Sequence, residues 1–142
     1  MLIKEPYYYD DTPTLIEATS WIEVKTFELN RDPFTSNIIK LFFEIVLKCS
    51  VGETGEIGIF IDNEPEPRIT KQYDLTFYHP IQLELDTINL AWGKHKIALC
   101  MRSKNGKPFY NTLFRVTALR FYTLWELVGY LTPIMTLQGM LE

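Results

Sequence analysis

Residues 37–50 read NIIKLFFEIVLKCS, and this stretch decides the fold class. Every second side chain from Ile39 to Cys49 is apolar, whereas the alternate positions include Lys40 and Glu44. A helix would scatter the apolar side chains around its circumference, whereas a strand brings alternate residues to one face. The stretch therefore predicts a long central strand with one face on the hydrophobic core.

Further alternating runs, separated by turn residues, indicate seven or eight strands in all. The runs are residues 21–29, 57–61, 75–78, 81–86, 93–102 and 109–122. In the first run, the alternation places Ile22 and Val24 on one side and Lys25 on the other. Short strands at regular spacing are typical of a sandwich rather than a βαβ fold. The sequence therefore predicts an all-β, antiparallel, jelly-roll-like sandwich over residues 19–122.

Turn residues predict how some of these strands connect. Asn105 and Gly106 lie between two alternating runs, and both tolerate the positive φ of a type I′ turn. The pair predicts a hairpin that joins residues 93–102 directly to residues 109–122. Pro80 is expected to stop the short strand at 75–78, because proline cannot donate to the ladder.

The first 18 residues are predicted to form an N-terminal arm outside the sheets. Pro6 and Pro13 remove ladder donors, and residues 1–18 show no periodicity. The arm carries three consecutive tyrosines: Tyr7, Tyr8 and Tyr9. These rings either pack on the domain itself or bind a neighbouring subunit, with their hydroxyls in water.

Residues 123–142 have a different pattern and predict a short amphipathic C-terminal helix. Thr123 and Glu126 match a capping box, and apolar residues follow at helical spacing. The candidate partner-binding residues here are Trp125, Leu127, Val128 and Leu131. Two alternatives stay open: the segment covers one open end of the sandwich, or it mediates self-association or partner docking together with the three tyrosines.

Composition excludes several classes of function. The net charge of −4 argues against a nucleic-acid partner, because such proteins neutralise phosphates with a Lys and Arg surface. No signal peptide and no membrane span are visible, so we expect synthesis in the cytoplasm, with or without assembly into a particle or surface structure. Cys49 and Cys100 lie far apart and lack a CxxC partner, which predicts two buried free thiols and no zinc site.

No pattern of catalytic or cofactor-binding residues is recognisable. His79 and His95 lack a nucleophile motif such as GxSxG, so both are predicted to be structural. Carboxylates for a glycosidase pair occur at Asp62, Glu64, Glu66, Glu84 and Asp86. Three of these, Asp62, Glu64 and Asp86, are also calcium candidates by ligand type. They lack the alternating acidic pattern of a dedicated loop, so we predict no metal, no cofactor and no enzyme.

Residues 55–64 (GEIGIFIDNE) and 81–122 carry a resemblance to a known class. The first of these stretches is a predicted strand that ends in an Asp-containing turn. The second contains Gly-x-His at the start of a strand, at Gly93, and a later strand that carries Asn111. Together these features resemble carbohydrate-binding jelly rolls of the galactose-binding-like class. The resemblance covers about half the chain and implies a sandwich fold, with a glycan as the ligand. The sequence departs from the sugar-binding pattern, because no exposed Trp or Tyr platform with a polar clamp can be identified in it.

Two functions follow from these observations. The main interpretation is a non-enzymatic structural or interaction module that forms a homo-oligomer or docks a protein partner, as small sandwiches do in virus particles and surface appendages. The alternative is a glycan-binding module.

Overall fold

The computed structural model describes residues 2–121, which form nine β-strands. The strands are β1 (Leu2–Asp10), β2 (Thr14–Ile16), β3 (Ile22–Arg31), β4 (Ile38–Cys49), β5 (Gly55–Ile61), β6 (Ile69–Tyr73), β7 (His79–Asp86), β8 (Gly93–Ser103) and β9 (Phe109–Phe121). The expected C-terminal helix, its capping box and the four candidate partner-binding residues between 125 and 131 lie outside the described residues.

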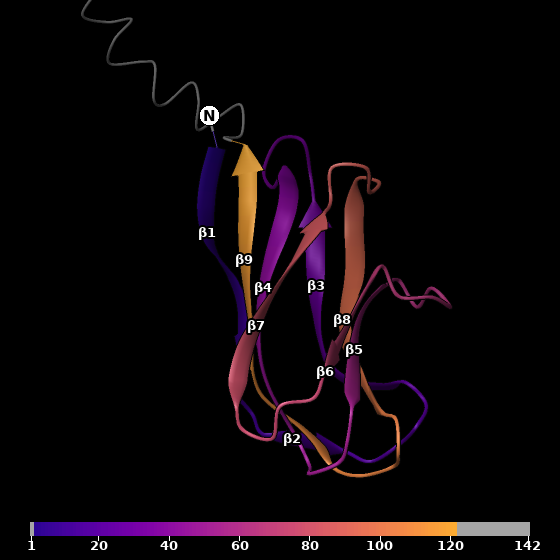
Figure 1. Cartoon of the computed structure of the whole chain (residues 1–142). Helices are drawn as coiled ribbons and strands as arrows, with labels where there is room; N and C mark the ends of the chain where they lie inside the picture. The colour runs from indigo at the N-terminus through magenta and orange to yellow at the C-terminus, as the bar shows by residue number, and fades with distance from the viewer. Residues whose placement is uncertain (1, 122–142) are drawn as a thin grey trace, which may run out of the picture.

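The strands form two antiparallel sheets packed face to face. Sheet A has the order β1-β9-β4-β7, with β2 also paired to β9, and sheet B has the order β3-β8-β5-β6. Figure 1 shows the two layers, with β1 and β9 at the left and β5 and β8 at the right. The prediction of an all-β antiparallel sandwich is therefore confirmed.

The core lies between the sheets, and the alternation in residues 37–50 identifies its main strand. Leu41, Phe43 and Ile45 are each at most 1% exposed, and Phe43 stacks on Phe114 of β9 with ring centroids 5.7 Å apart. One detail differs, because Ile38 is buried in place of Ile39. The pairing of β4 with β9 shifts register between Ile38 and Lys40. Because of this irregularity, the side chains before the shift lie on the opposite face from the one that simple alternation predicts.

The prediction that the N-terminal residues form an arm outside the sheets is wrong, because β1 is an edge strand of sheet A. It pairs with β9 from Leu2 to Asp10, and the register shifts between Pro6 and Tyr8. An edge strand tolerates proline at a bulge, since the ladder there is already interrupted. The short strand β2 then follows Pro13 and pairs with the start of β9.

The expected outward position of Lys25 is also wrong. Lys25 is only 4% exposed and lies on the core side of β3, whereas Thr26 is exposed. The register of β3 against β8 shifts between Glu23 and Lys25. A bulge of this kind inserts one residue, so every side chain beyond it changes face relative to simple alternation.

The predicted hairpin at Asn105-Gly106 does not form, because β8 and β9 belong to different sheets. Gly106 has a positive φ of 74°, and Asn105 is not among the positive-φ residues. The connection is held by the buried carboxylate of Glu53, which accepts backbone N–H bonds from Asn105 at 3.0 Å and Lys107 at 2.9 Å. The loop therefore crosses from one sheet to the other around a buried anion.

The turn with two positive-φ residues occurs instead at the end of β5. Asp62 and Asn63 have φ of 53° and 58°, and the Glu64 N–H donates to the Ile61 carbonyl at 2.9 Å. These are the features of a type I′ turn, and Asp and Asn adopt its positive φ more readily than most residues.

The region between residues 69 and 86 also differs from prediction. Residues 75–78 form no strand, and the unexpected strand β6 comes before them. Pro80 lies inside β7 rather than ending a strand, and β7 is an edge strand of sheet A. Proline is acceptable there because an edge strand has one side without ladder bonds.

Candidate functional site

The outer face of sheet B carries small side chains in its middle and long polar side chains towards both ends. In the middle, Cα pairing places Gly58 beside Cys100 and Ala98 beside Thr26. These outward residues are separate from the main core, because Ala98 and Cys100 belong to a second apolar cluster with Phe60.

Trp21 covers the middle of this face. Its ring packs edge-on against Phe60 with centroids 5.4 Å apart, and it passes so close to Gly58 that an added Cβ there would lie 3.1 Å from the indole. Phe60 and Pro67 would also lie 3.1 Å from such a Cβ, so a side chain at position 58 would require these three neighbours to shift by a few tenths of an ångström. The indole is partly buried and belongs to the same apolar cluster as Phe60.

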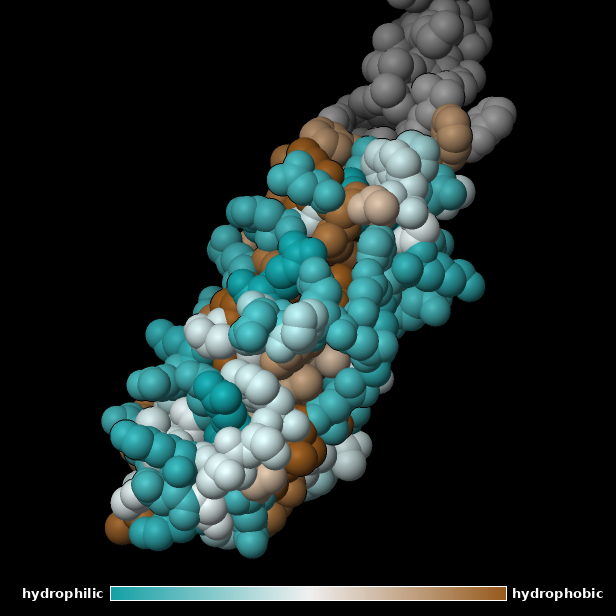
Figure 2. All heavy atoms as spheres, turned by 90° about the vertical axis from the view of Figure 1, so that its right-hand side faces the viewer, coloured by the Kyte–Doolittle hydropathy of each residue, from teal (hydrophilic) through white to brown (hydrophobic). Residues whose placement is uncertain are grey.

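A hollow of about 410 Å³ opens on the β5, β6 and β8 side of this face. Its polar lining residues are Thr19, Thr54, Glu56, Gln72, Arg102, Ser103 and Lys104. Figure 2 views the molecule from the side on which β5 and β8 lie in Figure 1, and it shows hydrophilic side chains with a broken band of hydrophobic atoms between them. The walls of the hollow are therefore polar.

Arg102 is held in place from two directions. Its guanidinium carbon lies 4.1 Å from the centroid of the Trp21 ring, and its Nε donates to Glu56 Oε1 at 2.8 Å. Its Nη2 also contacts Glu56 Oε1, so one carboxylate oxygen takes both contacts. A guanidinium has five N–H donors in a rigid fork, so donors remain for a ligand while the side chain stays fixed. A second carboxylate oxygen of Glu56 lies beside them as an acceptor.

A second hollow of about 410 Å³ lies on the β3 side of the same face. Its lining includes Thr26 and Glu28 of β3 and Lys94 and Lys96 of β8. Lys96 Nζ donates to Glu23 at 2.9 Å, and Lys94 Nζ lies 3.8 Å from Glu28. The outer face of sheet B thus has charged pairs on both sides of Trp21.

His95 lies at the rim of sheet B and stabilises the type I′ turn. Its Nδ1 is 2.6 Å from Asp62 Oδ2, and its Nε2 is 2.7 Å from the Ala91 carbonyl oxygen. The hydrogen bond to Asp62 is the main reason why the pKa of His95 is raised, and the Ala91 carbonyl adds to the effect. Burial raises the pKa of Asp62, but hydrogen bonds from His95 and the Lys96 N–H lower it overall. Both ring nitrogens are engaged by the fold itself.

The calcium candidates are not brought together. Glu64 pairs with Arg68 at 2.7 Å near the Asp62 turn, whereas Asp86 lies on β7 of sheet A and contacts Lys40 at 3.6 Å. Within residues 2–121, no group of three or more His, Cys, Asp or Glu side chains is placed to hold a metal ion. The same part of the chain contains no helix of the length and hydrophobicity needed to span a membrane.

Two of the three tyrosines pack on their own domain. Tyr8 stacks on Phe27 with centroids 5.0 Å apart, and Tyr7 packs edge-on against the same ring at 5.8 Å. The Tyr7 hydroxyl donates to the Glu28 carbonyl at 3.0 Å, which ties β1 of sheet A to β3 of sheet B. Tyr9 is 59% exposed. Of the three rings, Tyr9 alone presents most of its surface to solvent.

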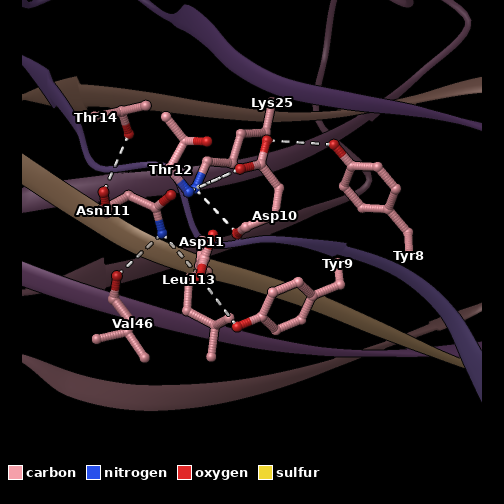
Figure 3. Close-up of polar contacts among 10 residues, drawn as sticks. All are labelled: Tyr8, Tyr9, Asp10, Asp11, Thr12, Thr14, Lys25, Val46, Asn111 and Leu113. Atoms are coloured by element: carbon pink, nitrogen blue, oxygen red, sulfur yellow. Dashed lines mark hydrogen bonds and ion pairs between the residues drawn. The ribbon is translucent and has the colours of Figure 1, made fainter.

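Figure 3 shows polar contacts beside Tyr8 and Tyr9, among which the contact of Lys25 on β3 with Asp10 on β1 joins the two sheets. The Lys25 ammonium donates to the Asp10 carbonyl at 3.2 Å and lies 3.8 Å from the Asp10 carboxylate. Burial lowers the pKa of Lys25, and the attraction of Asp10 opposes this shift. Asn111 donates to the carbonyls of Val46 at 3.0 Å and Leu113 at 2.9 Å and is fully buried. These contacts are structural and lie away from the outer face of sheet B.

Comparisons with known proteins give only distant structural likenesses. No protein-family model and no curated protein matches the chain. The chain is similar to the C-terminal domain of EclA, a sugar-binding protein, with 7% identity, a TM-score of 0.46, and coverage of 82% of this chain and 76% of that one. It is similar to dimeric latent PorU from Porphyromonas gingivalis, with 11% identity, a TM-score of 0.47, and coverage of 84% of this chain but 12% of that one.

A third similar structure is TmCBM61 in complex with β-1,4-galactotriose. The identity is 8% and the TM-score is 0.39, with coverage of 84% of this chain and 88% of that one. At these identities and TM-scores the comparisons do not identify a ligand for this chain.

Sequence reasoning missed the residues that line the outer face of sheet B. In the sequence, Trp21 begins the predicted strand at 21–29, and Arg102 ends the alternating run at 93–102. Glu56 and Arg102 are 46 residues apart in the sequence, and they form an ion pair because β5 and β8 pair at these two positions. A signal did exist, because Glu56 and Arg102 both occupy outward positions of alternating strands.

Proposed function

We propose that the protein is a non-catalytic glycan-binding module that holds a sugar chain on the outer face of sheet B. The observation that carries the proposal is the Arg102 guanidinium, stacked on Trp21 and bonded to Glu56 at the wall of an open hollow. The assembly function that was the main interpretation of the sequence remains a prediction.

The chemistry of this wall suits a neutral ligand with neighbouring hydroxyl groups. A sugar hydroxyl both donates and accepts, so it pairs with the remaining N–H groups of Arg102 and with the free oxygen of Glu56. The apolar C–H face of a sugar ring packs on apolar surface, and the part of Trp21 left uncovered by Arg102 and Phe60 lies beside the hollow rather than in its lining. Arg102 and Glu56 neutralise each other, so Lys104 carries the one remaining charge of the lining.

Pre-organisation supports a binding role. Arg102 loses little rotamer freedom when a ligand binds, since Trp21 and Glu56 already fix it. The hollow has the size of a small-molecule site and opens at a sheet face, so it suits a segment of an extended chain.

The same lining supports the absence of hydrolysis. Glycoside hydrolysis uses two carboxyl groups that flank the scissile bond. The residues that line the hollow contribute one carboxylate, Glu56, and it is already bonded to Arg102. The proposal is therefore binding without turnover.

The test is a glycan array followed by titration calorimetry with the best oligosaccharide. Arg102→Ala should weaken binding by about tenfold or more, since hydrogen bonds to a charged group contribute about 1.5–3 kcal/mol. The matched control is Arg115→Ala, which breaks a similar pair with Glu44 at 2.6 Å on sheet A. Binding that survives Arg102→Ala unchanged, or no retained glycan at millimolar concentration, would contradict the proposal.

A further inference from the structure

Five large apolar side chains are exposed on the start of β1, the end of β9 and the loops β3–β4 and β7–β8, which reach one end of the sandwich, at the top in Figure 1. We call this set the apolar end patch: Leu2, Phe34, Ile88, Trp92 and Phe121. Each is between 39% and 59% exposed. Single exposed apolar residues are normal on a protein surface, whereas several that share one end indicate an interaction surface.

The strand ends and loops that carry the residues of the apolar end patch lie next to one another. Leu2 pairs with Phe121, and the Phe121 N–H donates to the Asn37 carbonyl at 3.1 Å, beside the loop that carries Phe34. Strand β9 therefore reaches this end next to the loop between β3 and β4.

The loop between β7 and β8 is fixed at the same end by Arg31. This buried guanidinium donates to the Ile38 carbonyl at 2.9 Å and to the Ile88 carbonyl at 3.2 Å. Its guanidinium carbon also lies 4.3 Å from the centroid of the Trp92 ring. The apolar side chains of this loop therefore have a fixed position beside the loop between β3 and β4.

The chain itself supplies an occupant of matching chemistry. The 21 residues from 122 to 142 follow directly on Phe121 and carry two charged residues, Glu126 and Glu142. Their larger aliphatic and aromatic residues include Leu124, Trp125, Leu127, Val128, Leu131, Ile134, Met135 and Leu137. Because the segment begins inside the patch, a contact within the chain has an effective concentration of about millimolar, which favours it over a second molecule.

We propose that residues 122–142 dock onto the apolar end patch of their own chain. The segment would cover Phe34, Ile88 and Trp92. This selects the first of the two alternatives that the sequence left open for the segment. It is independent of the glycan-binding proposal, because the patch lies at the end of the sandwich rather than on the outer face of sheet B.

The test measures the reactivity of an introduced thiol with a neutral maleimide on the full chain. Ile88→Cys reports on the patch, and Val51→Cys, at an 81% exposed position in the turn between β4 and β5, is the matched control. The native thiols of Cys49 and Cys100 are buried, and burial raises the pKa of Cys100 to about 11, so both react slowly.

Ile88→Cys should react about tenfold more slowly than Val51→Cys, because the docked segment must detach before the maleimide can reach the thiol at position 88. Adding Leu127→Ser and Leu131→Ser should abolish this protection without changing the rate at Val51→Cys. Equal rates at the two positions in the intact chain would overturn the proposal, whether or not the doubly substituted chain folds. Protection that grows with protein concentration would also overturn it and would assign the patch to a second copy.

Discussion

Replacing Glu53 with alanine tests the physical account of the loop that crosses between the sheets. Glu53 is 3% exposed and accepts backbone N–H bonds from Thr54 at 2.8 Å, Asn105 at 3.0 Å and Lys107 at 2.9 Å. The two long-range bonds each contribute about 1.5 kcal/mol, the lower end of the range for charged acceptors, since the loop donors can regain water. Glu53→Ala should therefore lower the free energy of unfolding by about 3 kcal/mol.

The pH dependence of this effect has a definite sign. Burial raises the pKa of Glu53, but the backbone hydrogen bonds from Lys107, Asn105 and Thr54 hold it below its ordinary value overall. A carboxyl with a depressed folded-state pKa stabilises the protein above the ordinary glutamate pKa of about 4.3 and loses that contribution as the pH falls through the folded-state value. The difference between wild type and Glu53→Ala should therefore be full at pH 7 and shrink at low pH.

Urea denaturation at pH 7 and again near pH 3, followed by far-UV circular dichroism, measures both quantities. The matched control is Glu66→Ala, an exposed carboxylate in the loop between β5 and β6. A loss below about 1 kcal/mol at pH 7 would refute the reasoning, because surface substitutions alone reach about 0.5 kcal/mol. A loss that stays the same at low pH would refute the role assigned to the charge.

Two further predictions concern the core and the rim of sheet B. Phe43→Ala should destabilise the fold by about 3–5 kcal/mol in urea denaturation, because the ring is 1% exposed and stacks on Phe114; a loss under 1 kcal/mol would contradict its place in the core. The raised pKa of His95 means that its contribution to stability is full below the ordinary histidine value and is lost as the pH rises through the folded-state pKa. In an NMR titration Asp62→Asn should bring that pKa back down, and an unchanged titration would contradict the assigned partner.

The strands of the central core could be predicted because their alternation is complete. Residues 41–49 of β4 and residues 97–101 of β8 carry apolar side chains at every second position, and each of these positions is buried. Strand β6 was missed for the opposite reason. Its five residues lie at an edge with only Tyr73 fully buried, so it shows no apolar alternation.

Long-range pairing explains the other errors. Lys25 is on the core side because of a bulge against β8, and no local pattern predicts where a register shift falls. The Asn105-Gly106 pair looked like a hairpin because its local chemistry suits one, but the buried Glu53 fixes a crossing loop instead. The contact between Glu56 and Arg102 could not be predicted for the same reason, because it depends on the pairing of β5 with β8.

The most direct test of glycan binding on sheet B is a two-dimensional NMR titration with the best oligosaccharide from the array. The proposal predicts that the largest shifts occur at the Arg102 Nε–H, the Trp21 indole N–H and the backbone amides of β5 and β8 nearest Glu56. Shifts confined to the outer face of sheet A or to the apolar end patch, or none at saturating ligand, would contradict it.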